Sequence, residues 1–486
     1  MASPLAVPAY RGDTARQPKI RNRDDLLSCG DAVGREVVLD VTEQVLQRLD
    51  AYERIRGIAS LDGEDLTIGT RRWNLGHKRH VYLVGAGKAC NAMAMAVEDV
   101  LGDRLTAGIA IVKVAEDTDT LTRTQVVVGG HPLPNSAGLE ASRAILALVD
   151  QAGPDDLFIA VISGGSSALM TCPVDGISLQ DEQDATDVLL KSGAGIYEIN
   201  AVRRHISQTN GGRLAQRIAA RGAELIGIGI SDAVGNAPTG DIRVPYDRYA
   251  STPIGPDKTT LDDARRTIDE YDLADRLPAG IVTYLRNAGP ELETPKAFPQ
   301  NTYFLLNTVA DSARYAQEAA AHRGLPAHVV TTFLEGESKD AGAFFAALAR
   351  EIQTSGSPFA APCLLISAGE TTTLIADNTT ITGHGGPSQE LTIGFALVAA
   401  ATTGTCMLSI DSEGTDGTTP AAGGLTDSTT RLRADTAGVD LRAALRGHAS
   451  YEALSAVGDV VVTGNTGTNL CDFNLLYVPA LAGAPS

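Results

Sequence analysis

The stretch HVYLVGAGKACNAMAMAVEDVL, residues 80–101, contains a strand, a glycine turn and a helix in direct succession. Residues 80–84 are mostly apolar and end at a glycine, which predicts a short buried strand. The helix after the turn has apolar side chains at the spacing of one face: Met93, Ala96, Val97, Val100 and Leu101. A strand that leads into a helix through a short turn is the repeating unit of an α/β fold.

The same alternation continues along the chain. Further strands are predicted at 108–114, 125–128, 157–163 and 224–230, and helices at 32–52, 137–149 and 211–220. After a polar, proline-containing loop at 235–258, a second block has strands predicted at 363–367, 405–410 and 460–463, and helices at 389–401 and 439–445. For the first block we therefore expect a parallel sheet covered on both faces, and for the whole chain α/β structure in two lobes.

The composition is that of an acidic globular protein. The chain has 486 residues, 43% of them hydrophobic, and a formal net charge of −19. Such a chain repels phosphate backbones and anionic lipid surfaces, and it lacks an apolar run of 18 residues, so neither nucleic acid nor a membrane is expected as a partner. Six scattered cysteines without a CxxC pair indicate reduced thiols, and the first residues lack an apolar signal core, so we expect a cytoplasmic location.

The turn at residues 85–88, GAGK, is the first candidate binding element. Backbone N–H groups, the positive end of the helix and the Lys88 ammonium would meet at one spot, which suits phosphate or carboxylate. Tyr82 and Ala89 exclude a Walker A loop, and Cys90 replaces the third glycine of a dinucleotide fingerprint. A tight packing turn is the alternative that the residues leave open.

Residues 158–173, FIAVISGGSSALMTCP, contain a second turn between a strand and a helix. Gly164, Gly165, Ser166 and Ser167 offer N–H and O–H groups to phosphate oxygens. They do not form a hydrolase elbow, because Ala168 occupies the position of its last glycine. Here too a packing turn is the alternative.

Polar residues also gather at 195–218 and in several later loops. The first segment carries Glu198, Asn200, Arg203, Arg204, His205, Ser207 and Arg213, for which a solvated charged face is the simple explanation. The loops at 367–373, 383–390, 412–424 and 463–469 follow strands and include Glu370, Glu413 and Asp416, which are suited to hold hydrated Mg²⁺ or to act as a base. Loops that follow parallel strands meet at one edge of a sheet, so this set predicts a convergent cleft.

The order of ten motifs resembles that of the glycerate 2-kinase family, the class II glycerate kinases, some of whose members have been labelled hydroxypyruvate reductases. The motifs are GAGKA (85–89), HPLPNSAG (131–138), ISGGSSAL (162–169), LLKSGAGIYEINAVRRHIS (189–207), GGRLA (211–215), ISDAVGN (230–236), AGETTT (368–373), GGPSQE (385–390), GTDGTTPAAGG (414–424) and TGNTGTNLCD (463–472). The resemblance covers about residues 30–480.

The resemblance implies a large Rossmann-like three-layer domain and a smaller C-terminal α/β domain, with the active site in the cleft between them. With an extended lead-in at 1–30, the domains are expected at 31–290 and 291–486. It also implies that the protein is a kinase that uses ATP and Mg²⁺ to phosphorylate a small polar metabolite, by default D-glycerate to 2-phosphoglycerate.

Residue roles follow from the matching positions. Lys88, Asp232 and Asp416 are expected to be catalytic, and the two aspartates also to bind the metal. Substrate binding is expected of the residues that match the family's E-x-N-x-V-R-x-x-x-S segment: Glu198, Asn200, Arg203 and Ser207. Phosphate or nucleotide binding is expected of Gly85, Gly87, Gly164, Gly165, Ser166, Ser167, Glu370, Thr371, Thr466, Gly467, Thr468 and Asn469.

The chain departs from the family pattern at two cations. Pro387 stands where the family has an arginine, and Asn210 where it has a lysine. Both changes remove contacts that favour an anionic acceptor. The alternatives are therefore a diverged kinase for another hydroxy acid, polyol, sugar or nucleoside, a catalytically inactive binding protein and, less well supported, an NAD(P)-dependent reductase. The expected partners are ATP and a small molecule, and a homodimer is left open.

Overall fold

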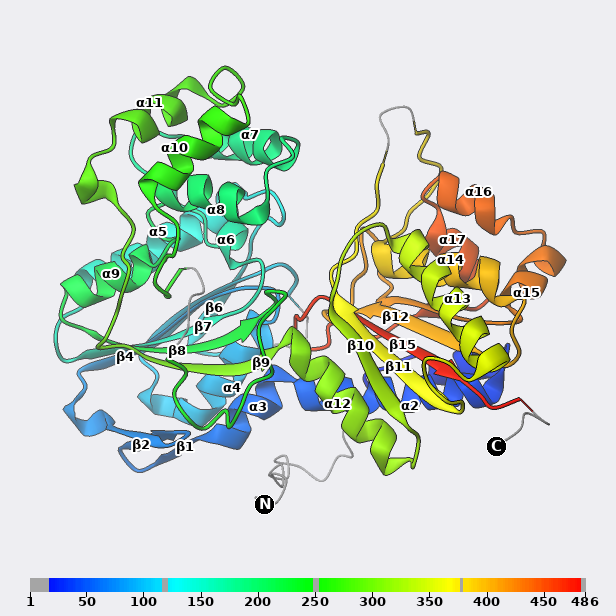
Figure 1. Cartoon of the computed structure of the whole chain (residues 1–486). Helices are drawn as coiled ribbons and strands as arrows, with labels where there is room; N and C mark the ends of the chain where they lie inside the picture. Colours follow the sequence, from blue (N-terminus) through cyan, green and yellow to red (C-terminus); the bar gives the residue numbers. More distant parts are fainter. Residues whose placement is uncertain (1–16, 116–120, 248–252, 376–378, 482–486) are drawn as a thin grey trace. The chain divides into compact units, whose positions relative to one another are not determined.

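The computed structural model describes residues 17–115, 121–247, 253–375 and 379–481, which divide into two compact units (Figure 1). The described part of the first unit comprises residues 51–231 and 240–306. That of the second comprises residues 17–50, 232–239 and 307–481. Each unit has one six-stranded sheet.

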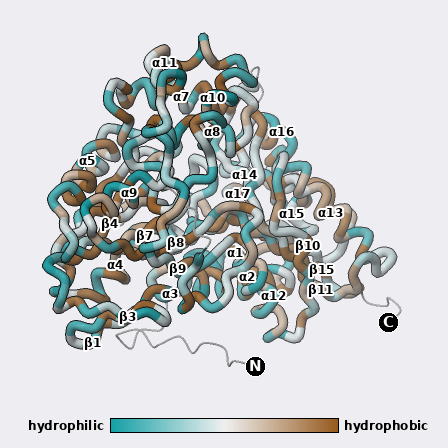
Figure 2. Tube along the Cα trace, turned by 60° about the vertical axis from the view of Figure 1, so that its left-hand side comes forward, coloured by the Kyte–Doolittle hydropathy of each residue, from teal (hydrophilic) through white to brown (hydrophobic). Residues whose placement is uncertain are grey.

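Five neighbouring strands of the first unit's sheet run parallel, as the sequence predicts. Its order is β6 (Thr124–Val128), β5 (Ala107–Val112), β4 (His80–Ala86), β7 (Asp156–Ile162), β8 (Glu224–Ser231) and β9 (Thr302–Thr308), and β6 to β8 pair in parallel. Helices α3 (Ala51–Ile58) and α4 (Cys90–Leu101) cover one face, and α5 (Ser136–Gln151) and α9 (Arg213–Ala220) the other (Figure 1). Figure 2 shows hydrophobic residues along the central strands β4 and β7. The expected Rossmann-like three-layer domain is confirmed.

Two parts of the first unit were not predicted. Three short strands, β1 (Ala59–Asp62), β2 (Asp65–Ile68) and β3 (Arg71–Asn74), form an antiparallel sheet. The helices α7 (Leu179–Leu190), α8 (Ile196–His205), α10 (Leu261–Glu270) and α11 (Ala279–Asn287) pack on a separate core that includes Leu189, Ile199, Ile268 and Ile281. Short helices lie at η1 (Leu75–His77), η2 (Gly102–Arg104), α6 (Ser166–Leu169) and η3 (Pro290–Leu292).

The sheet of the second unit is mixed. Its order is β10 (Ala327–Leu334), β11 (Cys363–Gly369), β15 (Asp472–Val478), β12 (Cys406–Asp411), β13 (Gly423–Asp427) and β14 (Val460–Val461). Only β10 and β11 pair in parallel, and the other neighbours are antiparallel. This unit differs from the first because β13 follows β12 through a loop without a crossover helix, so the chain must reverse direction. The expected second α/β block is confirmed.

Helices cover both faces of this second sheet. On one side are α13 (Ser338–Ser355) and α14 (Pro387–Ala399), and on the other α2 (Ala32–Leu49) and α12 (Val309–His322) (Figure 1). Shorter helices are α1 (Arg23–Leu27), α15 (Thr430–Ala437), α16 (Leu441–Arg446) and α17 (Ser450–Ala456). Within the described ranges, no helix is both long and apolar enough to cross a bilayer.

The chain divides at different places from those expected. Helix α2 belongs to the second unit, where the fully buried Arg35 guanidinium bonds Asp427 at 2.6 Å and Asp459 at 2.7 Å. Residues 291–306 belong to the first unit rather than to a C-terminal domain. Of the expected lead-in, residues 1–16 lie outside the described residues, and the remainder includes the short helix α1. The loop expected at 235–258 has neither helix nor strand over 235–247 and 253–258.

Candidate functional site

The turn between β4 and α4 uses its backbone donors within the protein. The N–H of Gly87 donates to Ile111 O at 3.1 Å, and that of Lys88 to Gly164 O at 2.9 Å. The N–H of Ala89 donates to Ser163 Oγ at 3.0 Å. The expected ring of amides at 85–88 therefore does not face a ligand, and the half-buried Lys88 side chain is the group that this turn can offer to an anion.

The loop after β7 is different, because it keeps backbone donors available. Gly165 has φ +83°, a left-handed conformation that glycine adopts without strain. The N–H groups of Gly164, Gly165 and Ser167 donate to no acceptor in the part of the chain that the structure describes. Since Lys88 N donates to Gly164 O, this loop lies directly beside the lysine turn. The two predicted phosphate-binding elements are thus adjacent in the structure.

His131 lies against the same loop. It follows β6, and a Cβ placed on Gly165 would lie 2.9 Å from His131 Cδ2, 3.2 Å from its Nε2 and 3.3 Å from Lys88 Cγ. Gly165 therefore separates an imidazole from the stem of a lysine. His131 lies in one of the ten motifs, but sequence reasoning assigned it no role. The available signal was a basic residue just after a parallel strand.

The turn at 207–212 supports this loop from the other side. Asn210 Nδ2 donates to Ser167 O at 3.0 Å, so the residue that stands in the place of the family lysine holds a carbonyl of the loop. Ser207 is completely buried, and its Oγ accepts from the N–H groups of Thr209 at 3.2 Å and Asn210 at 3.0 Å. In this structure the Ser207 hydroxyl shapes the turn. Its predicted substrate contact stays a prediction.

Helix α8 carries the other three predicted substrate residues. Glu198, Asn200 and Arg203 are each half-buried. Arg203 Nε is buried without a hydrogen-bond partner among the described residues. Burial lowers the pKa of Arg203, and the charge of Glu182 opposes that shift. A guanidinium held out of water in this way is suited to bind a carboxylate or phosphate oxygen.

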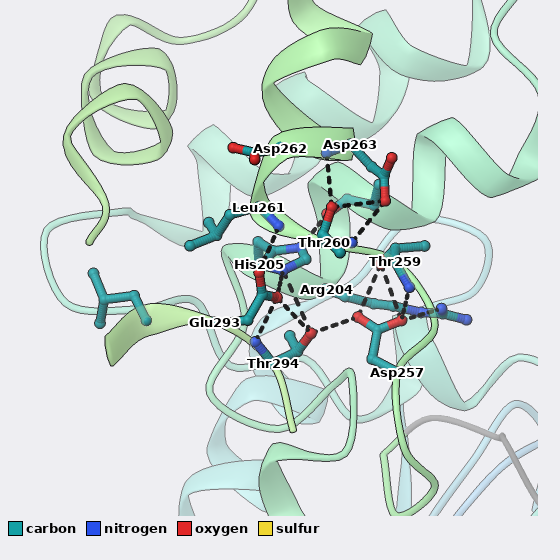
Figure 3. A network of polar contacts seen from close by, with 12 residues as sticks. Arg204, His205, Asp257, Thr259, Thr260, Leu261, Asp262, Asp263, Glu293 and Thr294 are labelled. Carbon is teal, nitrogen blue, oxygen red and sulfur yellow. Dashed lines mark hydrogen bonds and ion pairs between the residues drawn. The ribbon is translucent and has the colours of Figure 1, made fainter. Parts of the chain in front are cut away.

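The rest of the charged segment is not a solvated face, contrary to the simple explanation (Figure 3). His205 is fully buried, and its Nδ1 lies 2.7 Å from Ala201 O while its Nε2 lies 2.8 Å from Glu293 Oε1. His205 thus links the end of α8 to the segment that carries Glu293. Although burial opposes it, hydrogen bonds from His205, the Leu261 N–H and others hold the pKa of Glu293 well below its usual range.

Asp257 extends this network toward the turn. It accepts from Arg204 Nη1 at 2.6 Å, from the Thr259 N–H at 3.0 Å and from Thr294 Oγ1 at 3.0 Å. A Cβ on Gly211 would lie 2.9 Å from Thr294 Cγ2 and 3.3 Å from Asp257 Oδ2. The network thus packs directly behind the turn that carries Asn210.

In the second unit, Asp416 lies at the start of α14. Its Oδ2 accepts from the Gln389 N–H at 2.9 Å and its Oδ1 from the Ser388 N–H at 3.2 Å, so it caps the helix. A Cβ on Gly386 would lie 2.3 Å from Asp416 Cγ, which explains a glycine at the helix N-cap. Burial, together with the charge of Asp411, raises the pKa of Asp416 to about 7. Pro387 occupies the first position of this helix, where its missing N–H is not needed.

Asp472 is a second buried carboxyl that sequence reasoning did not single out. It accepts from the Thr371 N–H at 3.1 Å and from Ser388 Oγ at 3.1 Å, so Ser388 links it to Asp416. Burial and the charge of Asp416 raise the pKa of Asp472 to about 7. The strand register gives Asp472 its place, because this residue on β15 pairs with Gly369 on β11 and with Asp411 on β12.

Asp232 follows β8 and lies near residues of the late loops. Asn469 Nδ2 donates to Asp232 Oδ2 at 3.4 Å, and Cys471 Sγ lies 3.2 Å from Asp232 O and 3.8 Å from Glu370 Oε2. The structure thus brings together Asp232, Glu370 and Asn469. Groups of three or more metal-ligating side chains are absent from the described ranges.

The loop at 466–469 is largely bonded to itself and to neighbouring loops. The N–H of Thr466 donates to Glu413 O at 3.3 Å, that of Gly467 to Asn465 Oδ1 at 3.0 Å and that of Thr468 to Thr466 Oγ1 at 3.3 Å. Thr466, Thr468 and Asn469 are buried. Their predicted nucleotide contacts stay predictions.

Comparison with known proteins places the chain in a family. Residues 37–286 match the model described as domain of unknown function DUF4147, and residues 363–472 match the MOFRL family. The chain is 35% identical to the glycerate 2-kinase of Pyrococcus horikoshii, over 92% of this chain and 98% of that protein. It is 34% identical to the D-glycerate 2-kinase of Thermotoga maritima, over 81% of this chain and 89% of that protein. The crystal structure of Thermotoga maritima glycerate kinase superposes with a TM-score of 0.73 at 30% identity, covering 91% of this chain and 99% of that one. The chain therefore belongs to the glycerate 2-kinase family, whose members are phosphotransferases with an alcohol group as acceptor.

Proposed function

We propose that this protein transfers the γ-phosphoryl group of ATP to the 2-hydroxyl of D-glycerate and forms 2-phosphoglycerate. The observation that carries the proposal is the contact between the Lys88 turn and the 164–167 loop, where the stem of a lysine lies beside backbone N–H groups that donate to no acceptor among the described residues. The names of the relatives support the acceptor, since they are glycerate kinases.

Phosphoryl transfer asks little covalent chemistry of the protein. It requires that the charge on the transferring group be neutralised and that donor and acceptor be held in line. Lys88 and the amides of Gly164, Gly165 and Ser167 supply fixed positive and partly positive groups for phosphate oxygens. Ser166 and Ser167 add hydroxyl donors.

We assign the acceptor to α8. Arg203 supplies a desolvated guanidinium for the carboxylate of glycerate. Asn200 and Glu198, three and five residues before it on the same helix, offer an amide and an acceptor for hydroxyl groups. At roughly 100° per residue, Asn200 lies about 60° and Glu198 about 140° from Arg203 around the helix, so Asn200 is the better placed of the two to share a ligand with Arg203.

Mg²⁺ fits the residues present. This ion is bound through one or two carboxylates together with substrate phosphates, so a site with three protein ligands is not required. Of the predicted ligands, Asp232 is half-buried and lies near Glu370, whereas both oxygens of Asp416 already accept from α14. We therefore favour Asp232, with Glu370, as the side chains that would hold the ion, which supplies charge neutralisation on the phosphates when bound.

A less anionic acceptor is the second candidate. Pro387 places no cation at the start of α14, and the Asn210 amide is occupied by Ser167 O, so neither position compensates for the family cations. A charge-assisted contact contributes roughly 1.5–3 kcal/mol, or about ten- to a hundredfold in binding. On this reading, kcat/KM for a neutral polyol, sugar or nucleoside would exceed that for glycerate.

One experiment separates these functions. The purified protein is incubated with MgATP and a panel of hydroxy acids, polyols, sugars and nucleosides, and ADP release is followed while products are examined by mass spectrometry for the gain of one phosphate. We expect phosphorylated glycerate as the main product. A better neutral acceptor would establish the second candidate, whereas nucleotide binding without turnover of any acceptor would indicate a binding protein.

A further inference from the structure

We propose that His131 binds the anion that lies over Lys88 and the 164–167 loop, as a third donor beside the lysine and the loop amides. The inference rests on the proposed kinase function, because it concerns the oxyanion of that site. Its chemistry is that of a phosphate or carboxylate group, which nucleotide and acceptor both carry.

The topology places His131 at the same edge of the sheet as Lys88 and the 164–167 loop. It follows β6, Lys88 follows β4, and the loop follows β7, and these strands run parallel in one sheet. The carboxyl ends of parallel strands lie at one edge, where open α/β sheets bind their ligands. Three loops from that edge thus meet at one place.

Local geometry places the ring beside the other donors. The position where Gly165 lacks a Cβ is 2.9 Å from His131 Cδ2, 3.2 Å from His131 Nε2 and 3.3 Å from Lys88 Cγ. Gly165 combines this crowding with φ +83°, so the loop needs glycine both for its backbone and for the close approach of the two side chains. The His131 ring and the Lys88 stem therefore both lie against Gly165, the residue whose N–H we assign to the anion.

The competing role is packing alone, in which the ring only supports the loop. Two substitutions separate the roles. His131→Phe keeps a flat ring against Gly165 but removes both nitrogens, whereas His131→Gln loses the ring and keeps an N–H donor close to the position of Nε2. His77→Phe is the control, because His77 is an exposed histidine of the same unit in η1.

The test is direct binding of inorganic phosphate and of D-glycerate to each full-length variant by calorimetry, together with KM for MgATP and the melting temperature. We expect His131→Phe to weaken the binding of one of these anions about tenfold or more. The dissociation constants of His131→Gln and His77→Phe should stay within about threefold of the parent value. A loss for phosphate and not for glycerate identifies the nucleotide as the source of the anion, and the reverse identifies the acceptor.

Two results would overturn the inference. One is unchanged binding of both anions by His131→Phe. The other is an equal loss in His131→Phe and His131→Gln, with or without a lower melting temperature, since the retained donor would then make no difference. Because binding is measured without turnover, failure of the kinase assay with every acceptor would leave this test intact and would count against the proposed function alone.

Discussion

Lys88 lies at the end of β4 in a turn whose N–H groups already bond the protein, so any contribution of this turn to phosphate binding comes from its side chain. Lys88→Ala should lower kcat by about a hundredfold or more, which is the effect of losing one preorganised donor to the transition state. The melting temperature should change little. Steady-state kinetics check this, with Lys191→Ala as the control, since Lys191 is exposed and pairs only with Asp187 on the surface. Full activity of Lys88→Ala would refute the assignment.

Gly165 provides a second test at the scale of one residue. Gly165→Ala places a methyl group 2.9 Å from the His131 ring and strains a backbone with φ +83°, so we expect a large loss of kcat/KM for MgATP and a lower melting temperature. Gly176 has a similar φ of +89° but nothing within 4 Å of its Cβ position. Gly176→Ala therefore measures the backbone strain alone. Equal kinetic losses in both variants would show that crowding at residue 165 is irrelevant.

The sequence indicated some of these residues and not others, for a physical reason. Lys88 and Gly165 belong to local patterns, a strand and a glycine turn, that can be recognised in one window. His131 and Asp472 matter because strand register brings them beside residues far away in the chain, such as Gly165 and Asp411. The sequence also did not show that the N–H groups of the turn after β4 are already hydrogen-bonded, because their acceptors lie on β5 and in the loop after β7.

At the scale of one element, α14 tests what Asp416 does. Asp416→Ala removes the acceptor of two buried N–H groups and should lower the free energy of unfolding by about 1–3 kcal/mol. Asp416→Asn retains one acceptor oxygen and buries no charge, so it should lower the free energy of unfolding by less. Urea unfolding and kcat together decide the role: capping predicts near-normal kcat in Asp416→Asn, whereas loss of kcat at unchanged stability would support the catalytic or metal-binding role.

The network behind α8 predicts a pH dependence. The pKa of Glu293 in the folded protein lies below its ordinary value near 4.5, so its carboxylate stabilises the fold above that pH. This stabilisation is lost as the pH falls from about 4.5 toward the folded pKa. The unfolding free energy of the parent should therefore exceed that of Glu293→Gln at pH 7, and the difference should shrink at pH 3.5. Glu291→Gln, which changes an exposed neighbour, should show no such trend. A difference that is independent of pH would contradict the ion pair.

Strands could be predicted from the sequence where both of their faces are buried, because their residues are then almost all apolar. The central strands β4 and β7 are apolar along nearly their whole length because both faces are covered. β1 and β3 are four residues long and partly exposed, and β13 begins with two glycines, so none presents an apolar run. The direction of β12, β13 and β15 is not encoded in an apolar run either, so the mixed pairing of the second sheet could not be predicted.

At the scale of the whole molecule, the net charge of −19 predicts a salt effect. Self-repulsion destabilises a highly charged compact state, and salt screens it over about 10 Å at 0.1 M. Raising NaCl from about 0.05 to 0.5 M should therefore raise the melting temperature at pH 8. The rise should disappear near pH 5, close to the sequence pI of about 4.8. A melting temperature that falls with salt at pH 8 would show that local ion pairs dominate.

The division into units was the least predictable property. The apolar spacing at 32–49 indicates a helix but not which sheet it covers. That choice depends on Arg35 and its buried partners Asp427 and Asp459, which lie 392 and 424 positions later in the chain. A pattern within a short stretch of sequence cannot indicate a contact between residues so far apart in the chain.

The place of β15 in the second sheet has a consequence for synthesis on the ribosome. β15 lies between β11 and β12, yet it is made after every other strand of that sheet. Helix α2, which packs on the same sheet, leaves the ribosome before the first unit is made. While the first unit folds, α2 therefore has no sheet to pack on. Until residue 478 has emerged, no strand joins β11 to β12. The second unit therefore completes its fold only as translation of the described chain ends, and during that interval its exposed strand edges are the part of the nascent protein that most needs a chaperone.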